Sequence, residues 1–536
     1  MGKIFFNEDP NHFVISRKMA GYEKITMEDA RNFILQYKGT QITDFFVCLG
    51  ASGAWYDSEN GDNIIETYKR WAAEGKTGDG ETNVVVSSAR LVKDFYETYG
   101  TSLQAVWLDT LREIGIRPWI SIRMNDIHEA DAEESILHSD FFRENREKNR
   151  VSHREPAGYY DYALDYMFPE VREHYLKVVG DALRRFDMYG IELDFMREIY
   201  SVAVGREYEG IAVINAFMRS VDTLVREAEI RLGHGVKVAV RLPDTPEKAL
   251  RLGFDFFDWI DAGIVDCIIV TPRWASSDNH MPIDLWKKIL KGKSVTLAAG
   301  QEILIGAYNR RGFVPQYNTY ETAIATACAH HFQGADAIYL FNYMDALGPA
   351  GSVVTDDGRD LSLCLDRDVY RKFLCTAGDY ELSAAAHRRH VVTYSDVSAI
   401  GVTSRKQLPV RLSGDRKSPM GFSALRIATG KILPSQKVSV ILGFGGDGYE
   451  KEDIRVFLNA KPCRLVSEQE PHAQQYPDMR YYRFDAENNG DIAPVAVIEA
   501  GLFEGAAEVH WAEIEIGEPP LGDLRNVEKN KTRSFS

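Results

Sequence analysis

The 536-residue sequence has few cysteines and none of the motifs that pair them. Its six cysteines are scattered, with no C-x-x-C and no histidine at metal-ligand spacing, and four lie within apolar strand or helix patterns. This pattern predicts buried free thiols rather than a disulfide framework or a zinc site. Such cysteine usage is typical of a reducing compartment, and we therefore expect a cytoplasmic protein.

Long apolar runs and an excess of positive charge are also missing. No uncharged stretch approaches the roughly 20 residues that a membrane helix needs. The chain reaches Glu8 and Asp9 before any apolar run long enough for a signal peptide, so we expect none. The 63 Lys and Arg residues stand against 79 Asp and Glu, a formal net charge of −16. This charge argues against nucleic acid or an anionic membrane as the main partner.

The sequence lacks the usual motifs for nucleotide binding, metal binding and a serine nucleophile. No G-x-G-x-x-G or G-x-x-x-x-G-K follows an expected strand in the first 375 residues. A doubly wound sheet, the alternative fold, therefore lacks its usual nucleotide signal. No H-x-H or H-E-x-x-H spacing suggests a metal, and no serine lies in G-x-S-x-G. We expect no metal and no cofactor.

The first 375 residues alternate between short β-branched runs and longer helical patterns. This alternation is typical of βα units around a parallel sheet, and near-continuous apolar strands suit a sheet buried on both faces. Eight units in about 360 residues predict an α/β fold, a (β/α)8 TIM barrel with insertions. The expected strands are 13–17, 44–49, 117–123, 190–195, 237–241, 266–270, 294–299 and 337–341, and the expected helices are 27–38, 84–114, 169–186, 209–231 and 368–376.

Length and composition predict more than one domain. The apolar fraction of 45% and the charged fraction of 26% are ordinary globular values, and the chain is too long for one core. After about residue 385 the apolar period changes to two, between Gly, Asn and Pro turns. We expect a barrel over 1–380, an antiparallel β-sandwich over 385–517 and a polar flexible tail over 518–536.

The fourth expected strand, GIELDF, carries two carboxylates on one face. Strand alternation places Glu192 and Asp194 opposite the apolar residues, which should face the outer helices, so both carboxylates should point into the barrel. Barrel active sites lie at these carboxyl ends of the strands. Two carboxylates about 6.5–7 Å apart need compensating cations. Arginines at strand ends are placed to supply them: Arg123, Arg197, Arg241 and Arg273. The alternative is a structural salt-bridge layer that plugs the barrel.

The seventh expected strand leads to Glu302, across the barrel mouth from the fourth. Glycoside hydrolysis needs two carboxyl groups that flank one bond. Asp194 and Glu302 are the expected catalytic pair, and Glu192 is a further candidate. Asp194, among arginines, suits the nucleophile or general base, whereas Glu302, beside apolar residues, suits the acid. The alternative for Glu302 is a surface position on a loop or at a helix start.

Other residues at strand ends are candidates for substrate binding. Trp274 is either a sugar-stacking platform, because the CH face of a pyranose packs on an aromatic ring, or a packing residue. The insertions at 51–82 and 127–160 are longer than usual βα connections; their charge runs are typical of solvated surface, but their position makes them candidate lids. The expected substrate-binding residues are Arg123, Asn125, Asp126, His128, Arg197, Arg241, Arg273, Trp274 and Asn342.

Four segments in this order resemble bacterial barrel proteins labelled family 10-like glycosyl hydrolases. They are SIRMNDIH (121–128), ALDY leading to PEVR (163–172), GIELDFMR (190–197) and VRLP with TPE (240–247). The resemblance covers roughly residues 12–376 and, more loosely, the β-domain. It implies a glycosidase-like site around Asn125, Asp126, Glu192, Asp194 and Arg197. The Asn-Glu pair that ends the fourth strand of family 10 xylanases is absent, so xylanase activity is not implied.

The leading hypothesis is hydrolysis of an O-glycosidic bond in a short oligosaccharide or glycoside, a substrate size that suits a cytoplasmic enzyme. One alternative is a lyase or epimerase acting on an acidic sugar, which would explain the several arginines. Another is a carbohydrate-binding protein without catalysis. The sequence is compatible with a homo-oligomer, and neither nucleic acid nor a membrane is expected as a partner.

Overall fold

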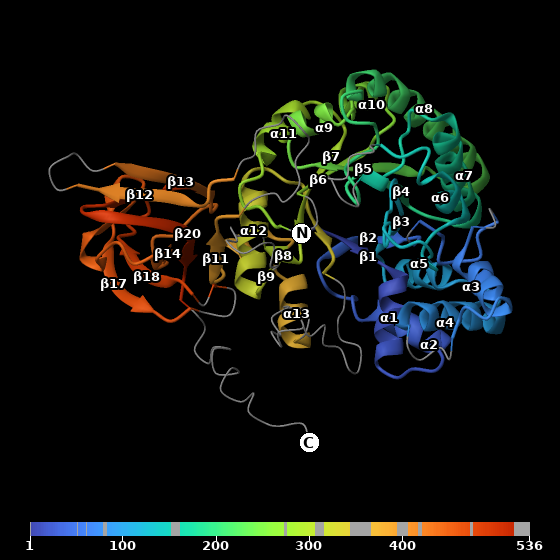
Figure 1. Cartoon of the computed structure of the whole chain (residues 1–536), viewed down its shortest axis with the longest axis horizontal. Coiled ribbons are helices and arrows are strands. Elements are labelled where there is room, and N and C mark those ends of the chain that lie inside the picture. The colour runs from blue at the N-terminus through green and yellow to red at the C-terminus, as the bar shows by residue number, and fades with distance from the viewer. Residues whose placement is uncertain are drawn as a thin grey trace.

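The computed structural model describes residues 2–50, 52–59, 62–78, 83–151, 161–272, 276–305, 316–343, 366–393, 406–415, 421–471, 475–476 and 478–518. These residues form a closed parallel barrel followed by two packed antiparallel sheets (Figure 1). The expected fold class, a TIM barrel with a C-terminal β-sandwich, is confirmed. Arg273, Trp274 and the expected tail after residue 518 lie outside the described residues.

Eight strands close the barrel in sequence order, and the last pairs in parallel with the first, with Ile338 opposite Ile4. The strands are β1 (Ile4–Glu8), β2 (Ile42–Cys48), β3 (Arg117–Arg123), β4 (Gly190–Asp194), β5 (Lys237–Pro243), β6 (Cys267–Thr271), β7 (Thr296–Glu302) and β10 (Ala337–Phe341). A two-stranded sheet of β8 (Leu304–Ile305) and β9 (Gln316–Tyr317) follows β7.

Helices surround the barrel, and their buried faces cover its outer surface (Figure 1). They are α1 (Pro10–Met19), α2 (Met27–Leu35), α3 (Ile64–Ala73), α4 (Val84–Tyr99), α5 (Leu103–Glu113), α6 (Asp140–Asn145), α7 (Pro169–Arg185), α8 (Glu207–Leu232), α9 (Pro246–Arg251), α10 (Phe256–Asp261), α11 (Ile283–Ile289), α12 (Tyr320–Phe332), α13 (Arg367–Leu374) and α14 (Tyr380–Ala385). The helical patterns expected through 84–114 form two helices, α4 and α5, because Gly100 ends α4 in a left-handed conformation.

The prediction of a first strand at 13–17 is wrong. The first strand is β1, and residues 13–17 lie within α1. Pro10 occupies the first turn of α1, where its fixed φ suits a helix, and Phe13 and Val14 are buried against the core. Burial of this helix face outweighs the β-propensity of the short run.

A cluster of buried, mostly aromatic and apolar side chains fills the inside of the barrel. The apolar cluster inside it includes Phe46, Trp119 and Tyr339. Gly190 is required opposite Trp119, because a Cβ at position 190 would overlap the indole ring. The polar side chains lie above this packed layer, at the carboxyl ends of the strands.

The β-sandwich consists of a six-stranded and a four-stranded sheet that share one apolar core. The larger sheet contains β11 (Arg388–Val391), β12 (Val410–Gly414), β14 (Val438–Gly445), β17 (Arg464–Gln469), β18 (Arg480–Ala486) and β20 (Gly505–Ile516). The smaller contains β13 (Phe422–Ala428), β15 (Ile454–Leu458), β16 (Lys461–Pro462) and β19 (Val495–Leu502).

The sandwich packs on the barrel where its strand β11 lies against helix α12 of the barrel (Figure 1). Thr393 Oγ1 donates a hydrogen bond of 2.6 Å to the carbonyl oxygen of Ser277. Ile305, three residues after the end of β7, joins an apolar cluster with Val391 and Trp511 of the sandwich. The sandwich therefore supports the segment that follows Glu302.

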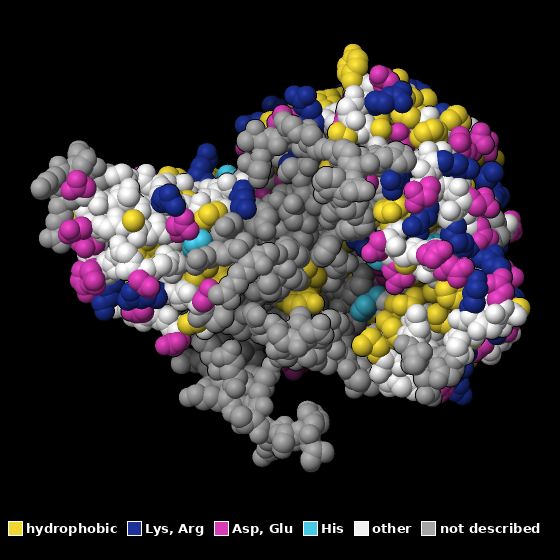
Figure 2. Space-filling model, viewed as in Figure 1, with side chains coloured by type: hydrophobic (Ala, Val, Ile, Leu, Met, Phe, Trp, Pro, Cys, Tyr) yellow, Lys and Arg dark blue, Asp and Glu magenta, His cyan; other side chains and the backbone are white. Residues whose placement is uncertain are grey.

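Acidic and basic side chains are interspersed over the described part of the face shown in Figure 2. In the part of the chain that the structure describes, no helix is long and apolar enough to cross a membrane. The five described cysteines are unpaired, and Cys48, Cys267 and Cys328 are buried.

Candidate active site at the barrel mouth

Strand β4 presents both of its carboxylates to the inside of the barrel. Asp194 lies in register between Arg123 of β3 and Arg241 of β5, and Glu192 lies one inward position lower. The side chain of Asp194 is 1% exposed, and Glu192 is fully buried. Parallel register therefore places an arginine on each side of Asp194.

Arg241 joins Asp194 to Glu302. Its Nη1 lies 3.0 Å from Asp194 Oδ2, and its Nη2 lies 3.1 Å from Glu302 Oε1. Nε donates to Thr271 Oγ1 at 3.1 Å, and the guanidinium lies 3.6 Å from the centre of the Phe341 ring. Burial disfavours the charged guanidinium, but the nearby carboxylates outweigh burial and raise the pKa of Arg241 above its usual value.

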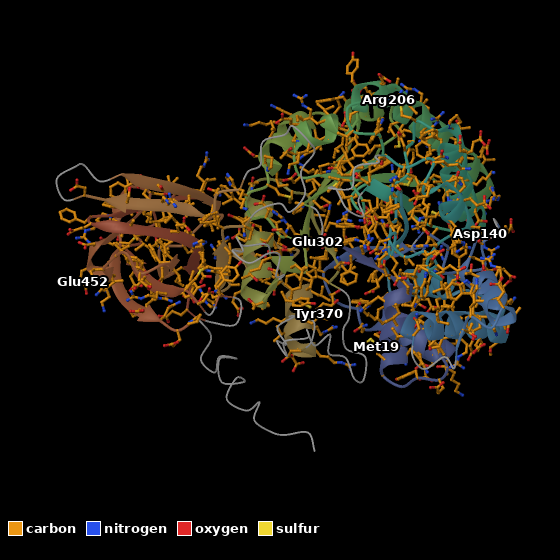
Figure 3. The ribbon with its side chains drawn as sticks, viewed as in Figure 1. Met19, Asp140, Arg206, Glu302, Tyr370 and Glu452 are labelled. Atoms are coloured by element: carbon orange, nitrogen blue, oxygen red, sulfur yellow. The ribbon has the colours of Figure 1, made fainter. Side chains whose placement is uncertain are left out.

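Backbone and side-chain donors fix both carboxylates of this pair. Asp194 Oδ1 accepts hydrogen bonds from the backbone N–H groups of Met196 (2.8 Å) and Arg197 (3.0 Å). Glu302 Oε2 accepts one from Asn342 Nδ2 at 3.2 Å. Asn342 has a φ of 61°, the left-handed region, which turns the chain directly after β10. Figure 3 shows Glu302 near the centre of the molecule.

Glu192 lies below the pair in a more enclosed position. Its Oε2 accepts a hydrogen bond of 3.4 Å from Asn7 Nδ2, and the hydroxyl groups of Ser121 and Tyr339 are neighbours. Burial, followed by the negative charge of Asp194, raises the pKa of Glu192 to about 7. Glu192 can therefore hold a proton near neutral pH, unlike an ordinary surface glutamate.

The end of β1 and the start of α1 contribute four residues that the sequence prediction missed: Asn7, Glu8, Asp9 and His12. Asp9 forms a buried ion pair with Arg123, and Glu8 Oε1 lies 3.2 Å from His12 Nδ1. They were missed because the first strand was placed at 13–17. The available signal was an apolar run that ends in carboxylates, directly before Pro10, as in β4.

The segment after β3 adds a chain of charged and polar groups. Arg123 Nη1 donates to Asp126 Oδ2 at 3.0 Å, and His128 Nδ1 lies 2.7 Å from Asp126 Oδ1. Arg197 Nη2 lies 2.6 Å from the other ring nitrogen of His128. Burial opposes ionisation of Asp126, but His128, Arg123 and Arg197 together hold its pKa well below its usual range.

Asn125 supports the site rather than opening to it. Its Nδ2 donates to the carbonyl oxygens of Leu164 (2.9 Å) and Tyr200 (3.0 Å), and its Oδ1 accepts from the Leu164 N–H. The residue is 1% exposed. Its amide therefore ties together the segments after β3 and β4 and is not free to bind a substrate.

The structure thus brings most of the expected residues to one end of the barrel. Those at the mouth with Glu192, Asp194 and Glu302 are Arg123, Asp126, His128, Arg197, Arg241 and Asn342. Of these, His128 is partly accessible, with 36% of its side chain exposed. Among the residues described, no group of three or more His, Cys, Asp or Glu side chains is arranged to hold a metal ion.

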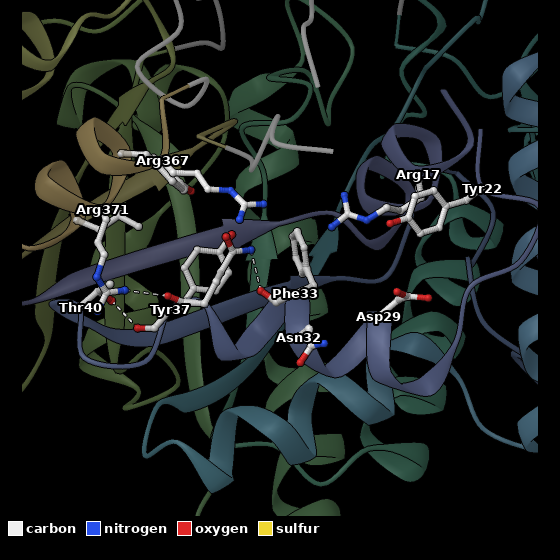
Figure 4. A pocket seen from close by; sticks show the side chains of 12 residues that line it. Arg17, Tyr22, Asp29, Asn32, Phe33, Tyr37, Thr40, Arg367 and Arg371 are labelled. Carbon is white, nitrogen blue, oxygen red and sulfur yellow. Dashed lines mark hydrogen bonds between the residues drawn. The ribbon is translucent and has the colours of Figure 1, made fainter. Parts of the chain in front are cut away.

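A cavity of about 450 Å³ lies away from this mouth, between α1, α2 and α13. Arg17 and Arg367 extend into it, above Phe33 and Tyr37 (Figure 4). Arg371 donates to the carbonyl oxygens of Gln36 and Lys38, which joins α13 to the end of α2. None of the carboxylates of the barrel mouth, Glu192, Asp194 and Glu302, lines this cavity.

The sequence matches no protein-family model and no curated protein sequence. Similar solved structures include a cycloisomaltooligosaccharide glucanotransferase from Paenibacillus sp. (10% identity, 95% of this chain and 57% of that chain, TM-score 0.30). Others are a GH138 enzyme targeting pectin rhamnogalacturonan II (11% identity, 71% and 40%, TM-score 0.38) and α-L-fucosidase isoenzyme 1 from Paenibacillus thiaminolyticus (12% identity, 94% and 96%, TM-score 0.33). The chain spans 57% and 40% of the length of the first two. At these TM-scores the similarities carry no argument about function.

Proposed function

We propose that this protein is a glycoside hydrolase that cleaves an O-glycosidic bond in a short oligosaccharide or glycoside. The observation that supports it is the placement of Asp194 and Glu302 on two nitrogens of one guanidinium at the barrel mouth. Two carboxyl groups on either side of one bond are what this reaction needs: one protonates the leaving oxygen, and the other attacks the anomeric carbon or activates water.

We assign Asp194 as the nucleophile or general base and Glu302 as the general acid. Two backbone N–H groups and Arg241 fix the orientation of Asp194, so it presents its oxygens in one geometry. Glu302 is held by Arg241 and by Asn342, a partly exposed residue. Glu192, below them, serves as a proton-holding neighbour that sets the charge of the site.

A lyase or epimerase acting on an acidic sugar is the second candidate function. The observation that favours it is the guanidinium of Arg197, which lies at the mouth and makes no ion pair with a carboxylate among the described residues. A cation in that position suits an anionic substituent on the substrate.

Analysis of the products separates the candidates. The full chain is incubated with a panel of neutral and acidic oligosaccharides, and products are followed by mass spectrometry and ultraviolet absorbance. We expect fragments whose masses sum to that of the substrate plus one water. Fragments that absorb in the ultraviolet and sum to the substrate alone would identify a lyase, an unchanged mass with altered configuration an epimerase, and binding without product a carbohydrate-binding protein.

We also propose that the enzyme works in the cytoplasm on short substrates. The proposal is supported by the five described cysteines, none of which is in a disulfide. Measurement of enzyme and activity in separated cell fractions tests it: activity confined to the medium or the cell surface would contradict it.

A further inference from the structure

Arg197, just after β4, is an arginine at the mouth that has no carboxylate partner among the described residues. The two other arginines of the site are each paired with two carboxylates: Arg123 with Asp9 and Asp126, and Arg241 with Asp194 and Glu302. The guanidinium of Arg197 contacts only the ring of His128 within the described part of the chain, and its Nε is buried with no acceptor. A half-buried cation with an unused N–H group is well placed to receive an anion.

His128 does not neutralise this cation. Asp126 is ionised and accepts hydrogen bonds from both the backbone N–H and the Nδ1 of His128, so Nδ1 carries the ring proton. Arg197 Nη2 lies 2.6 Å from Nε2 and 3.5 Å from Nδ1 of this ring, so the guanidinium lies over the imidazole and gains no negative charge from it. Asp126 itself is on the far side of this ring and already binds Arg123.

The position of Arg197 relates it directly to the proposed catalytic pair. Its backbone N–H donates to Asp194 Oδ1, so its side chain extends from the immediate neighbourhood of that carboxylate. The side chain of His128 is 36% exposed and Arg197 is partly exposed, so solvent reaches both residues. A sugar bound at Asp194 would therefore have its substituents within reach of this guanidinium.

We propose that Arg197 and His128 form an anion-binding subsite, and that the substrate carries an anionic group, a uronic-acid carboxylate or a sulfate ester, on the sugar beside Asp194. The location of that sugar rests on the proposed function. The planar edge of a guanidinium matches two oxygens of a carboxylate or sulfate, and Nε supplies one of the two N–H groups that such a pairing uses. His128, held by Asp126, fixes the plane of the guanidinium before the ligand arrives.

The test compares matched acidic and neutral ligands. Affinity is measured by calorimetry on the full chain carrying Asp194→Asn, which prevents turnover. The probes are galacturonic acid, glucuronic acid and galactose-sulfate oligosaccharides, each with its neutral galactose or glucose counterpart. We expect at least one acidic ligand to bind at least tenfold more tightly than its neutral counterpart, and the member that binds distinguishes carboxylate from sulfate.

Substitutions then assign the preference to this subsite. Adding Arg197→Gln should remove the acidic preference, so that acidic and neutral members bind alike, whereas Arg197→Lys should retain part of the preference. The matched control is Arg206→Gln, an exposed arginine on the same connection that pairs with Glu209, and it should behave as the parent. Equal affinity for acidic and neutral members, a preference that survives Arg197→Gln, or no binding by any acidic probe would each overturn the proposal.

Turnover by the unsubstituted chain separates this inference from the proposed function. If an acidic probe binds in a manner that depends on Arg197 but is never hydrolysed, the anion-binding subsite is supported and the proposed hydrolysis is contradicted. If neutral and acidic probes are hydrolysed with the same kcat/KM, and Arg197→Gln does not change it, the proposed hydrolysis is supported and the anion-binding subsite is contradicted.

Discussion

Asp194 on β4 and Glu302 on β7 are joined through one guanidinium: Arg241 Nη1 lies 3.0 Å from Asp194 Oδ2, and Nη2 lies 3.1 Å from Glu302 Oε1. All three side chains are at most 1% exposed. One buried cation therefore compensates two carboxylates, and a third, Glu192, lies directly below. The energetics of the site follow from this balance of charge.

Replacing Arg241 by Met should make stability depend on pH. Loss of the shared cation leaves uncompensated buried carboxylates, whose pKa values rise in the folded state, so stability is retained at low pH and lost as the pH rises. We expect a loss of about 3–5 kcal/mol at pH 8 and a smaller loss at pH 5, measured by urea unfolding. Arg219→Met removes an exposed pair with Asp258 and should cost less than about 1 kcal/mol. Equal losses for Arg241→Met at the two pH values would contradict the account.

Gly300 on β7 should be required because of its neighbour on β6. A Cβ at position 300 would overlap Cγ2 of Thr271, whose Oγ1 accepts from Arg241 Nε. Gly300→Ala should therefore destabilise the fold by about 1–3 kcal/mol and lower kcat. Thr271→Ser removes Cγ2 and keeps the hydroxyl, so the double variant should be about as stable as Thr271→Ser alone. A double-mutant cycle measures this, and simple additivity would refute the proposed clash.

Two substitutions of Asn342 should distinguish the effect of backbone strain from the effect of the hydrogen bond to Glu302. Its φ of 61° suits Gly or Asn, and its Nδ2 donates to Glu302 Oε2. Asn342→Ala should lose about 1–2 kcal/mol through the left-handed conformation and also lower kcat. Asn342→Gly removes the same hydrogen bond without that strain, so it should lower kcat similarly while remaining the more stable variant. Thermal unfolding and steady-state kinetics on both variants check this, and wild-type kcat in Asn342→Gly would mean that the amide does not support Glu302.

Glu192 should make the wild-type protein less stable as the pH rises. Its folded pKa is raised from 4.5 to about 7, so its contribution is fully present below about pH 4.5 and is lost as the pH rises to about 7. Glu192→Gln cannot ionise and should gain up to about 3 kcal/mol relative to wild type between these limits. Urea unfolding at several pH values measures the difference, and a constant difference across this range would show that Glu192 is already ionised in the folded protein.

The alternation of β4 carried enough information to orient its carboxylates, because a strand buried on its outer face leaves only the inside of the barrel for Glu192 and Asp194. The sequence predicted that Asp194 and Glu302 share the barrel mouth, but it did not predict that Arg241 bridges them. The distances depend on Arg241 adopting one conformation over Phe341, which packing decides.

For two features the local pattern alone was not decisive. Residues 13–17 have strand propensity, but the buried face of α1 and the neighbouring Pro10 decide in favour of a helix, and Asp9 was missed as a result. Asn125 was expected to contact the substrate because it follows a strand. Its amide instead binds backbone groups of Leu164 and Tyr200, and the sequence does not show that these distant segments meet there.

The most direct test of the account is the turnover of Asp194→Asn and Glu302→Gln on a substrate identified by the product analysis. Each substitution keeps the size of the side chain but replaces one of two acceptor oxygens by an amide group and removes an ionisable group. We expect kcat to fall by about 10²–10⁴-fold with little change in KM. Glu513→Gln, a buried carboxylate paired with Arg389 in the sandwich, is the matched control and should keep wild-type kcat. If Glu302→Gln keeps near-normal turnover while Glu192→Gln or Asp126→Asn abolishes it, the pair is misassigned and β3 and β4 carry the chemistry.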